Sequence, residues 1–224
     1  MFWSEDTDEK GKFVVPDKVV DVVYNISCKC LPTEHIYALS EALQQAMPWL
    51  DEEEQAAVHP ITGPEEGNGW EKPTDKIMHL SRRQKMMIRI PKSRLAEAEK
   101  LTGQILVIDG YELKVGKSTI KLLSDLPTVF ARHVICDADM SEDEFMHATL
   151  AQIQDLDVKV RKMMAGKERA IETPDETIMT RSLMLAELEP VESVRLQEQG
   201  IGEGKMLGCG LFIPQKGISA VNPD

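Results

Sequence analysis

The chain has 224 residues, enough for one large domain or two small ones, and its net charge of −12 argues at first sight against a polyanionic partner. No apolar run approaches membrane-spanning length, and the acidic N-terminus lacks a signal core. The four cysteines show no CxxC spacing, which disfavours a zinc site or a disulfide framework. We therefore expect a reduced, cytoplasmic protein with no membrane partner.

The first half of the chain predicts a ferredoxin-like module over residues 18–125. Residues 1–17 are rich in acids and are expected to form a disordered arm. Hydrophobic periodicity then predicts a strand at 18–30, a helix from Pro32, strands at 76–81 and 85–91, a helix at 92–102, and strands at 104–108 and 111–115. The last two flank Asp109-Gly110, a strong signal for a two-residue hairpin. The order is β-α-β-β-α-β with an extra hairpin.

The second half predicts the same arrangement over residues 126–224. We expect a strand at 128–136, a helix opened by the capping box of Ser141 and Glu144, a strand at 158–164, a hairpin at 167–185, a helix at 190–199 and a final strand at 209–213. The predicted fold class is therefore α+β, with two tandem ferredoxin-like modules and a glycine-rich loop before the last strand.

The glycine-rich loop holds five glycines around one cation, Lys205: they are Gly200, Gly202, Gly204, Gly208 and Gly210. Glycine lets the backbone approach a ligand closely, so the N–H groups of such a loop can hold an anion. The predicted order is helix, loop, strand, which is the reverse of a dinucleotide-binding loop. A helix C-cap followed by a hairpin is the alternative. Upstream, the Gly116-Lys117-Ser118-Thr119 run has the wrong spacing for a nucleoside triphosphate loop, and β-prone residues follow it.

Two groups of basic residues stand out against the acidic average. Arg82, Arg83 and Arg89 belong to one strand region, where we expect them on the exposed face of a sheet. Arg161, Lys162, Lys167 and Arg169 lie on the predicted hairpin of the second half. Each group is either a solvated surface or a track for phosphates, and the occurrence of two such groups favours RNA.

Two histidines are candidates for general base catalysis, because imidazole takes up a proton near neutral pH. His35 lies in the first turn of the first predicted helix, and His59 precedes a proline in a glycine-rich loop. Neither has a serine, cysteine or metal-ligand partner nearby in the sequence, so an ordinary structural histidine remains the alternative for each.

The Gly200-Ile-Gly202 and Gly208-Cys-Gly210 pattern, after a helix and before the last strand, resembles the glycine-rich signature of the RAMP superfamily. More specifically, the chain resembles CRISPR-associated endoribonucleases of the myxobacterial type that process precursor crRNA. The supporting segments are 31–39, His59-Pro60-Ile61, Gly67-Asn-Gly-Trp70, Leu80-Ser-Arg-Arg83, 180–184 and 205–214. The resemblance covers nearly the whole chain beyond the acidic arm.

The resemblance implies cleavage of CRISPR repeat RNA without a metal or other cofactor. The ribose 2′-OH attacks the adjacent phosphate and leaves a 2′,3′-cyclic phosphate and a 5′-OH. His59 matches the position of the family's histidine better than His35, which is kept as the second candidate. Gly202, Lys205, Gly208, Gly210 and the two basic groups are the implied RNA contacts, and other Cas subunits of an effector complex are possible partners. The alternatives are a non-catalytic RAMP subunit that caps a guide RNA and an enzyme acting on a small molecule.

Overall fold

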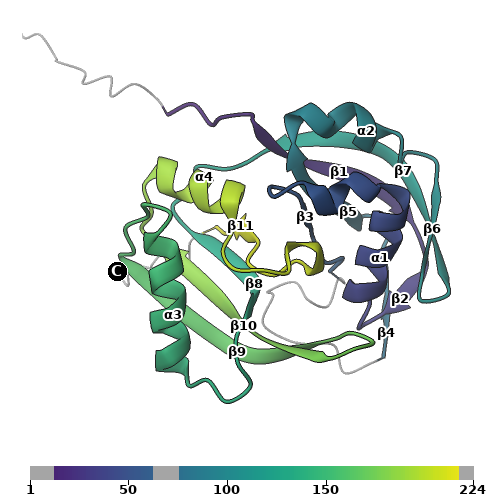
Figure 1. Cartoon of the computed structure of the whole chain (residues 1–224). Coiled ribbons are helices and arrows are strands. Elements are labelled where there is room, and N and C mark those ends of the chain that lie inside the picture. The colour runs from purple at the N-terminus through teal and green to yellow at the C-terminus, as the bar shows by residue number, and fades with distance from the viewer. Residues whose placement is uncertain (1–12, 63–75, 217–224) are drawn as a thin grey trace, which may run out of the picture.

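The computed structural model describes residues 13–62 and 76–216. The first half contains β1 (Val19–Ser27), β2 (Cys30–Pro32), α1 (Ile36–Ala46), η1 (Pro48–Glu52), β3 (Ala57–Val58), β4 (Ile77–His79), β5 (Lys85–Pro91), η3 (Lys92–Arg94), α2 (Leu95–Glu99), β6 (Ile105–Ile108) and β7 (Tyr111–Leu122). The second half contains β8 (Val129–Ile135), α3 (Glu142–Gln154), β9 (Lys162–Glu172), β10 (Thr177–Ala186), α4 (Pro190–Gln199), η4 (Lys205–Leu207) and β11 (Phe212–Pro214). Figure 1 shows the two halves side by side.

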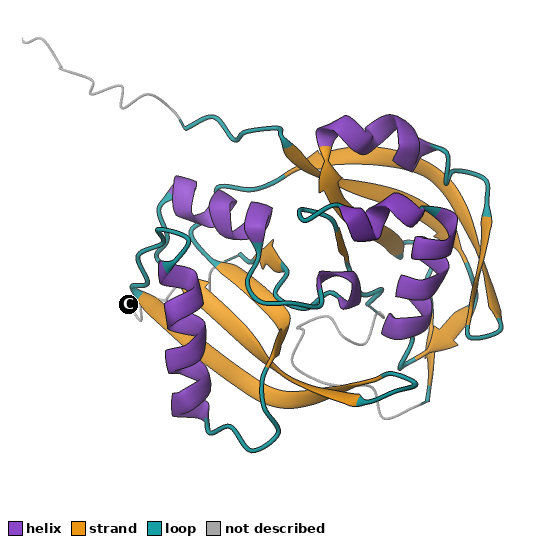
Figure 2. Ribbon diagram, viewed as in Figure 1, coloured by secondary structure: helices purple, strands orange, loops and turns teal. Residues whose placement is uncertain are grey.

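Each half is built on one antiparallel sheet. The first sheet has the order β3-β5-β1-β7-β6, and the second has the order β11-β8-β10-β9. Without the added strand β6, both sheets place the four strands of a β-α-β-β-α-β unit in the order 4-1-3-2, which is the ferredoxin-like arrangement. The predicted fold class, two tandem ferredoxin-like modules, is therefore confirmed (Figure 2).

Local sequence signals account for the ends of the helices. Pro48 ends α1, because the residue before a proline is forced out of the helical region, and Met47 has φ −139° and ψ 77°. Ser141 and Glu144 form the predicted capping box at the start of α3. Gly200 ends α4 with φ 64°, a conformation that favours glycine.

The predicted limits of several strands differ from the observed ones; the final strand, for example, is Phe212–Pro214 and not 209–213, and three differences affect the topology or a predicted site. The strand expected over residues 18–30 is interrupted after Ser27, so β1 and β2 join different sheets. The strand expected at 158–164 is not a separate element, because β9 starts at Lys162 and runs unbroken to Glu172. Arg161, just before β9, forms an ion pair with Glu192 in the first turn of α4. Strand β7 continues to Leu122, so the Gly116–Thr119 run lies within a strand and not in a phosphate-binding loop.

Each half has its own hydrophobic core. In the first half, Val20, Val22 and Tyr24 of β1 pack with Leu39 and Leu43 of α1. In the second half, the core is formed by residues such as Val129, Phe145, Leu183, Leu196 and Phe212. No helix in the described ranges is long and apolar enough to cross a membrane.

The end of the predicted acidic arm contacts the fold. Phe13 and Val15 pack against a small cluster formed by Val19, Leu123 and Val194. Residues 1–12, where most of the predicted disorder falls, lie outside the described residues, as does the Gly67–Trp70 segment. The domain boundary near residue 125 remains a prediction, although all strands up to Leu122 belong to the first half and all from Val129 to the second.

Candidate nucleic-acid interface

His59 follows the short strand β3 and is held in place from two directions. Its backbone N–H donates a hydrogen bond to the carbonyl of Met87 at 3.0 Å. Its Nε2 lies 3.3 Å from Oδ1 of Asp21 on β1, and the His59 residue is only 6% exposed. Burial lowers the pKa of His59, and the hydrogen bond to Asp21 opposes that shift. His59 is therefore neutral at neutral pH, as a general base must be.

His35 has both of its ring nitrogens engaged in hydrogen bonds. The backbone N–H of Ile61 donates to its Nε2 at 3.2 Å, so that nitrogen carries no proton, and Nδ1–H donates to the carbonyl of Pro32 at 3.0 Å. Burial lowers the pKa of His35. A proton cannot be accepted at Nε2 without breaking the bond to Ile61, so this arrangement suits a structural histidine.

The exposure predicted for Arg89 is wrong. Its side chain is buried, with Nε 2.8 Å from Oδ1 of Asp21, and its Nη1 donates to the carbonyls of Gln197 at 2.7 Å and Phe212 at 2.8 Å. The strand alternation correctly placed Arg89 on the face opposite the core of the first half. The second half covers that face, so Arg89 reaches the backbone of the other half and not solvent.

A cavity of about 360 Å³ lies between the two halves, and four cations and His59 line it. The cations are Arg83, Lys85, Lys121 and Arg132. Arg83 was among the RNA contacts predicted from the sequence, whereas Lys85, Lys121 and Arg132 were not. The strand register was the missing signal: Lys121 of β7 pairs with Asp21 of β1, which places it on the same sheet face as His59.

The remaining basic candidates are spread over a larger surface. Arg82 is exposed in the turn before β5 and does not line the cavity. Arg161 pairs with Glu192 at 2.5 Å, and Lys162 pairs with Glu187 at 2.6 Å. At about 3.3 Å per residue, Arg169 lies roughly 25 Å farther along the strand than Arg161, so the two cannot bind one phosphate.

The far end of β9 approaches the first half. Lys167 is exposed there, and Arg169 lines a small cavity of about 50 Å³ together with His35, Arg132 and His133. The β9–β10 hairpin lies beside the start of α1 (Figure 1). Lys167 and Arg169 are thus placed closer to the junction of the two halves than Arg161 and Lys162.

The glycine-rich loop uses most of its polar groups within the protein. The N–H of Gly208 donates to the carbonyl of Lys205, and the N–H of Gly210 donates to that of His133 at 2.7 Å. Both N–H groups thus have partners within the protein, and contacts of Gly208 and Gly210 with RNA stay a prediction. Lys205 Nζ donates to the carbonyl of Glu54 at 2.8 Å, which ties the loop to the first half. Gly202 is exposed, and its role stays a prediction.

Gly208 packs directly on the segment that carries His59. It has φ 73°, and a Cβ added there would lie 2.7 Å from Cδ of Pro60 and 3.0 Å from the carbonyl oxygen of Val58. Only glycine allows this approach in this backbone conformation. The loop lies between the two halves (Figure 1), where it supports the residues on either side of His59.

The described residues contain no group of three or more histidine, cysteine or acidic side chains placed to hold a metal ion. The cavity combines the neutral imidazole of His59 with four cationic side chains. Such a set can accept a proton and stabilise negative charge on a phosphate.

A comparison with protein families matches residues 20–217 to the family described as Cas6 Crispr. Among curated proteins, the CRISPR-associated endonuclease Cas6 of Myxococcus xanthus strain DK1622 is 29% identical over 195 residues, which are 87% of this chain and 81% of that protein.

Solved structures share the fold at low sequence identity. One described as CRISPR associated protein Cas6 has a TM-score of 0.58 at 10% identity and covers 88% of this chain and 100% of its own. Another, described as a RAMP protein binding different RNA substrates, has a TM-score of 0.56 at 14% identity, with the same two coverages. Both likenesses concern the arrangement of the two modules.

Proposed function

The chain belongs to the Cas6 family of CRISPR-associated proteins, and from this premise we propose that it is an endoribonuclease that cleaves CRISPR repeat RNA in precursor transcripts. The curated relative from Myxococcus xanthus is named an endonuclease, which supports this proposal. The finer proposal is that cleavage needs no metal ion and yields a 2′,3′-cyclic phosphate and a 5′-OH.

His59 is the proposed general base. Its Nε2 faces a carboxylate, which can only accept a hydrogen bond, so Nε2 carries the proton and Nδ1 has the free lone pair. Among the described residues, no hydrogen-bond partner of Nδ1 is found. Nδ1 takes the proton of the 2′-OH while the 2′ oxygen bonds to phosphorus. The bond from phosphorus to the 5′ oxygen breaks, and that oxygen takes up a proton from water.

The cations of the cavity are the proposed phosphate contacts. Attack by the 2′ oxygen places additional negative charge on the phosphoryl oxygens, and positioned cations stabilise that charge more in the transition state than in the substrate. Lys121 and Arg132 come from different halves, so an RNA strand bound by both must lie across their junction. The single observation that carries the proposal is this union of a neutral histidine and four cations in one cavity.

The test is to incubate the protein with hairpin repeat RNAs in EDTA and to map the ends of the products. The matched control is the same RNA with a single 2′-deoxy nucleotide at the cleavage site, which removes the attacking hydroxyl and preserves the binding surface. We expect cleavage of the ribose form only, with a cyclic phosphate end. Cleavage of the deoxy form would contradict the mechanism, and cleavage only after a divalent metal is added would contradict metal independence. Tight binding without cleavage under either condition would instead indicate the non-catalytic RAMP subunit.

A further inference from the structure

Asp21 lies between His59 and Arg89 and contacts both. Its Oδ1 is 3.3 Å from Nε2 of His59 and 2.8 Å from Nε of Arg89, and its Oδ2 is 3.2 Å from Nη2 of Arg89. Asp21 is 2% exposed and Arg89 is 1% exposed. Asp21 lies on β1, Arg89 lies on β5, and His59 directly follows β3. These three strands are neighbours in one sheet, so backbone pairing brings the residues together.

The carboxylate of Asp21 decides which nitrogen of His59 can act. Burial raises the pKa of Asp21, but the hydrogen bond from His59 and the charge of Arg89 outweigh burial and hold that pKa well below its usual range. Asp21 is therefore ionised and can only accept hydrogen bonds. An ionised partner also favours the imidazolium that forms when His59 has taken up a proton.

Arg89 connects this pair to the second half of the molecule. Its Nη1 donates to the carbonyl of Gln197, in the last turn of α4, and to the carbonyl of Phe212, the first residue of β11. A carbonyl in the last turn of a helix lacks an intrahelical partner and carries part of the negative end of the helix dipole. The guanidinium of Arg89 thus donates hydrogen bonds to acceptors in both halves, so its position depends on both.

We propose that Asp21 is a positioning residue that fixes the tautomer of His59, and that Arg89 makes this alignment depend on the docking of the second half. The proposal deepens the proposed function and rests on it for its kinetic consequence. Stability alone does not explain the arrangement, because a buried ion pair contributes little net stability compared with apolar residues of the same size.

The tautomer of His59 can be measured in the wild-type protein, with Asp21, His59 and Arg89 all in place. Full-length protein labelled with ¹⁵N-histidine reports by NMR which ring nitrogen carries the proton, and the signals of His59 are assigned as those missing from His59→Ala. At pH 8 we expect the Nε2–H tautomer. The Nδ1–H tautomer would overturn the proposal, whether or not the protein cleaves RNA.

Asp21→Asn tests the kinetic consequence. An asparagine can turn its NH₂ toward His59, which favours the wrong tautomer, so single-turnover cleavage is expected to slow by roughly 10–10³-fold with an unchanged dissociation constant for RNA. The low-pH limb of the rate profile is expected to move to lower pH, because the carboxylate that favours the imidazolium is gone. The charged groups around His59 that remain are Arg89 and Lys121, with Arg83, Lys85 and Arg132 along the cavity.

Asp17→Asn is the matched control, because Asp17 is a nearby aspartate just before β1 that is exposed and pairs with Lys92. It is expected to keep the wild-type rate and profile. An Asp21→Asn protein with an unmoved profile would overturn the proposal, and so would one whose rate falls only through weaker RNA binding. If wild-type protein cleaves no repeat RNA, the proposed function fails, while the tautomer measurement still decides the role of Asp21. The same measurement decides it if Asp21→Asn does not fold.

Arg89→Lys tests the dependence on the second half. Lysine keeps the charge, but it cannot bind Asp21 through two nitrogens and reach both carbonyls. We expect a slower single-turnover rate and a mixture of His59 tautomers. A wild-type rate together with a single Nε2–H tautomer would overturn the part of the proposal that concerns Arg89.

Discussion

His35 and His59 are both buried and neutral, yet their hydrogen bonds give them different capacities. Backbone groups occupy both nitrogens of His35, whereas Asp21 occupies one nitrogen of His59. The same difference predicts how each contributes to stability. Burial lowers the pKa of both below the ordinary value of 6.5, so the unfolded chain takes up protons before the folded protein does as the pH falls.

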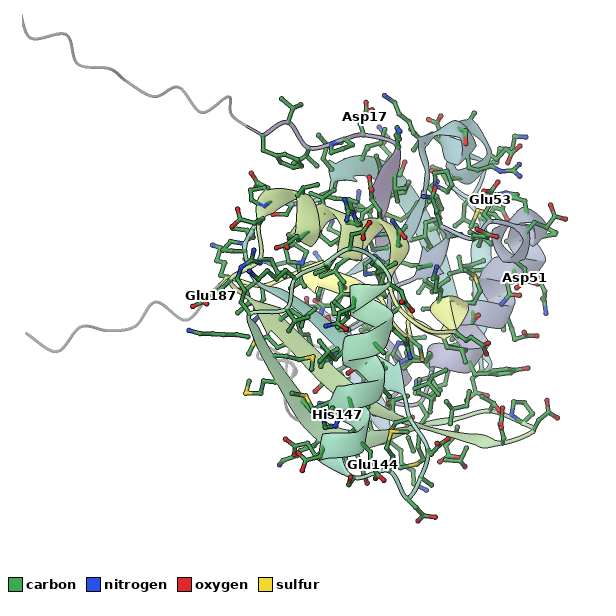
Figure 3. The ribbon with its side chains drawn as sticks, turned by 60° about the vertical axis from the view of Figure 1, so that its left-hand side comes forward. Asp17, Asp51, Glu53, Glu144, His147 and Glu187 are labelled. Carbon is green, nitrogen blue, oxygen red and sulfur yellow. The ribbon has the colours of Figure 1, made fainter. Side chains whose placement is uncertain are left out.

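The first prediction is that His35→Gln weakens the pH dependence of stability. The free energy of unfolding should fall as the pH drops below 6.5, because the unfolded state then binds more protons. Removing one such histidine should reduce that slope by at most about 1.4 kcal/mol per pH unit. Denaturant titrations at pH 7.5 and 5.5 measure it. The control is His147→Gln, because His147 is exposed on α3 (Figure 3). Equal slopes for the two variants would contradict the account.

At the scale of an element, the glycine-rich loop acts as a joint between the two halves. Its N–H groups at Gly208 and Gly210 are bonded internally, Lys205 is bonded to Glu54, and Gly208 packs against Pro60. Close packing of this kind transmits a change in the loop to the residue beside Pro60, which is His59.

The second prediction compares two alanine substitutions at glycines of positive φ. Gly208 has φ 73° with Pro60 and Val58 in its way, and Gly110 has φ 83° with nothing within 4 Å. Gly110→Ala should cost about 1–2 kcal/mol from backbone strain alone. Gly208→Ala should cost more, because the new Cβ must also displace the proline. Denaturant unfolding of both variants gives the difference, and equal costs would show that the loop is not packed as described.

At the scale of the whole molecule, basic and acidic side chains line different cavities, although the net charge is −12. Gly208 lines the cation-rich cavity, while the preceding residues of the loop line a different cavity that is rich in acids: Glu41, Asp51, Glu53, Glu54 and Glu203. Figure 3 labels Asp51 and Glu53 on the first half. Acids repel a phosphate backbone, so RNA is expected only on the cation-rich side of the loop.

The third prediction is that two lysines differ in their effect on the salt dependence of RNA binding. Lys121→Ala should reduce the slope of log K against log salt by about 0.7–0.9, since one phosphate contact is lost. Lys205→Ala should leave that slope unchanged, because its ammonium binds a backbone carbonyl at the acidic side. Binding isotherms at several salt concentrations measure both slopes. A reversed order would place the RNA path along the glycine loop.

How much of the fold and of the candidate site could be predicted depends on how far apart in the sequence the interacting residues lie. Periodicity and the capping box predicted both modules. The sequence also offered His59 as a candidate, and the structure places it in the cavity between the halves, while its catalytic role stays a prediction. The partners of Arg89 were not predictable, because it bonds to residues 108 and 123 positions later in the chain. Alternation within a strand shows that a residue faces away from its own core. It cannot show that another half of the molecule covers that face.

The central claim is that His59 is the general base, and single-turnover cleavage of repeat RNA in EDTA by His59→Ala tests it most directly. We predict a rate lower by roughly 10²–10⁴-fold with little change in RNA binding, and partial recovery when imidazole is added as a diffusible base. His35→Ala, compared at the same fraction of folded protein, should lose less and should gain nothing from imidazole. A His59→Ala variant that cleaves at the wild-type rate would contradict the account.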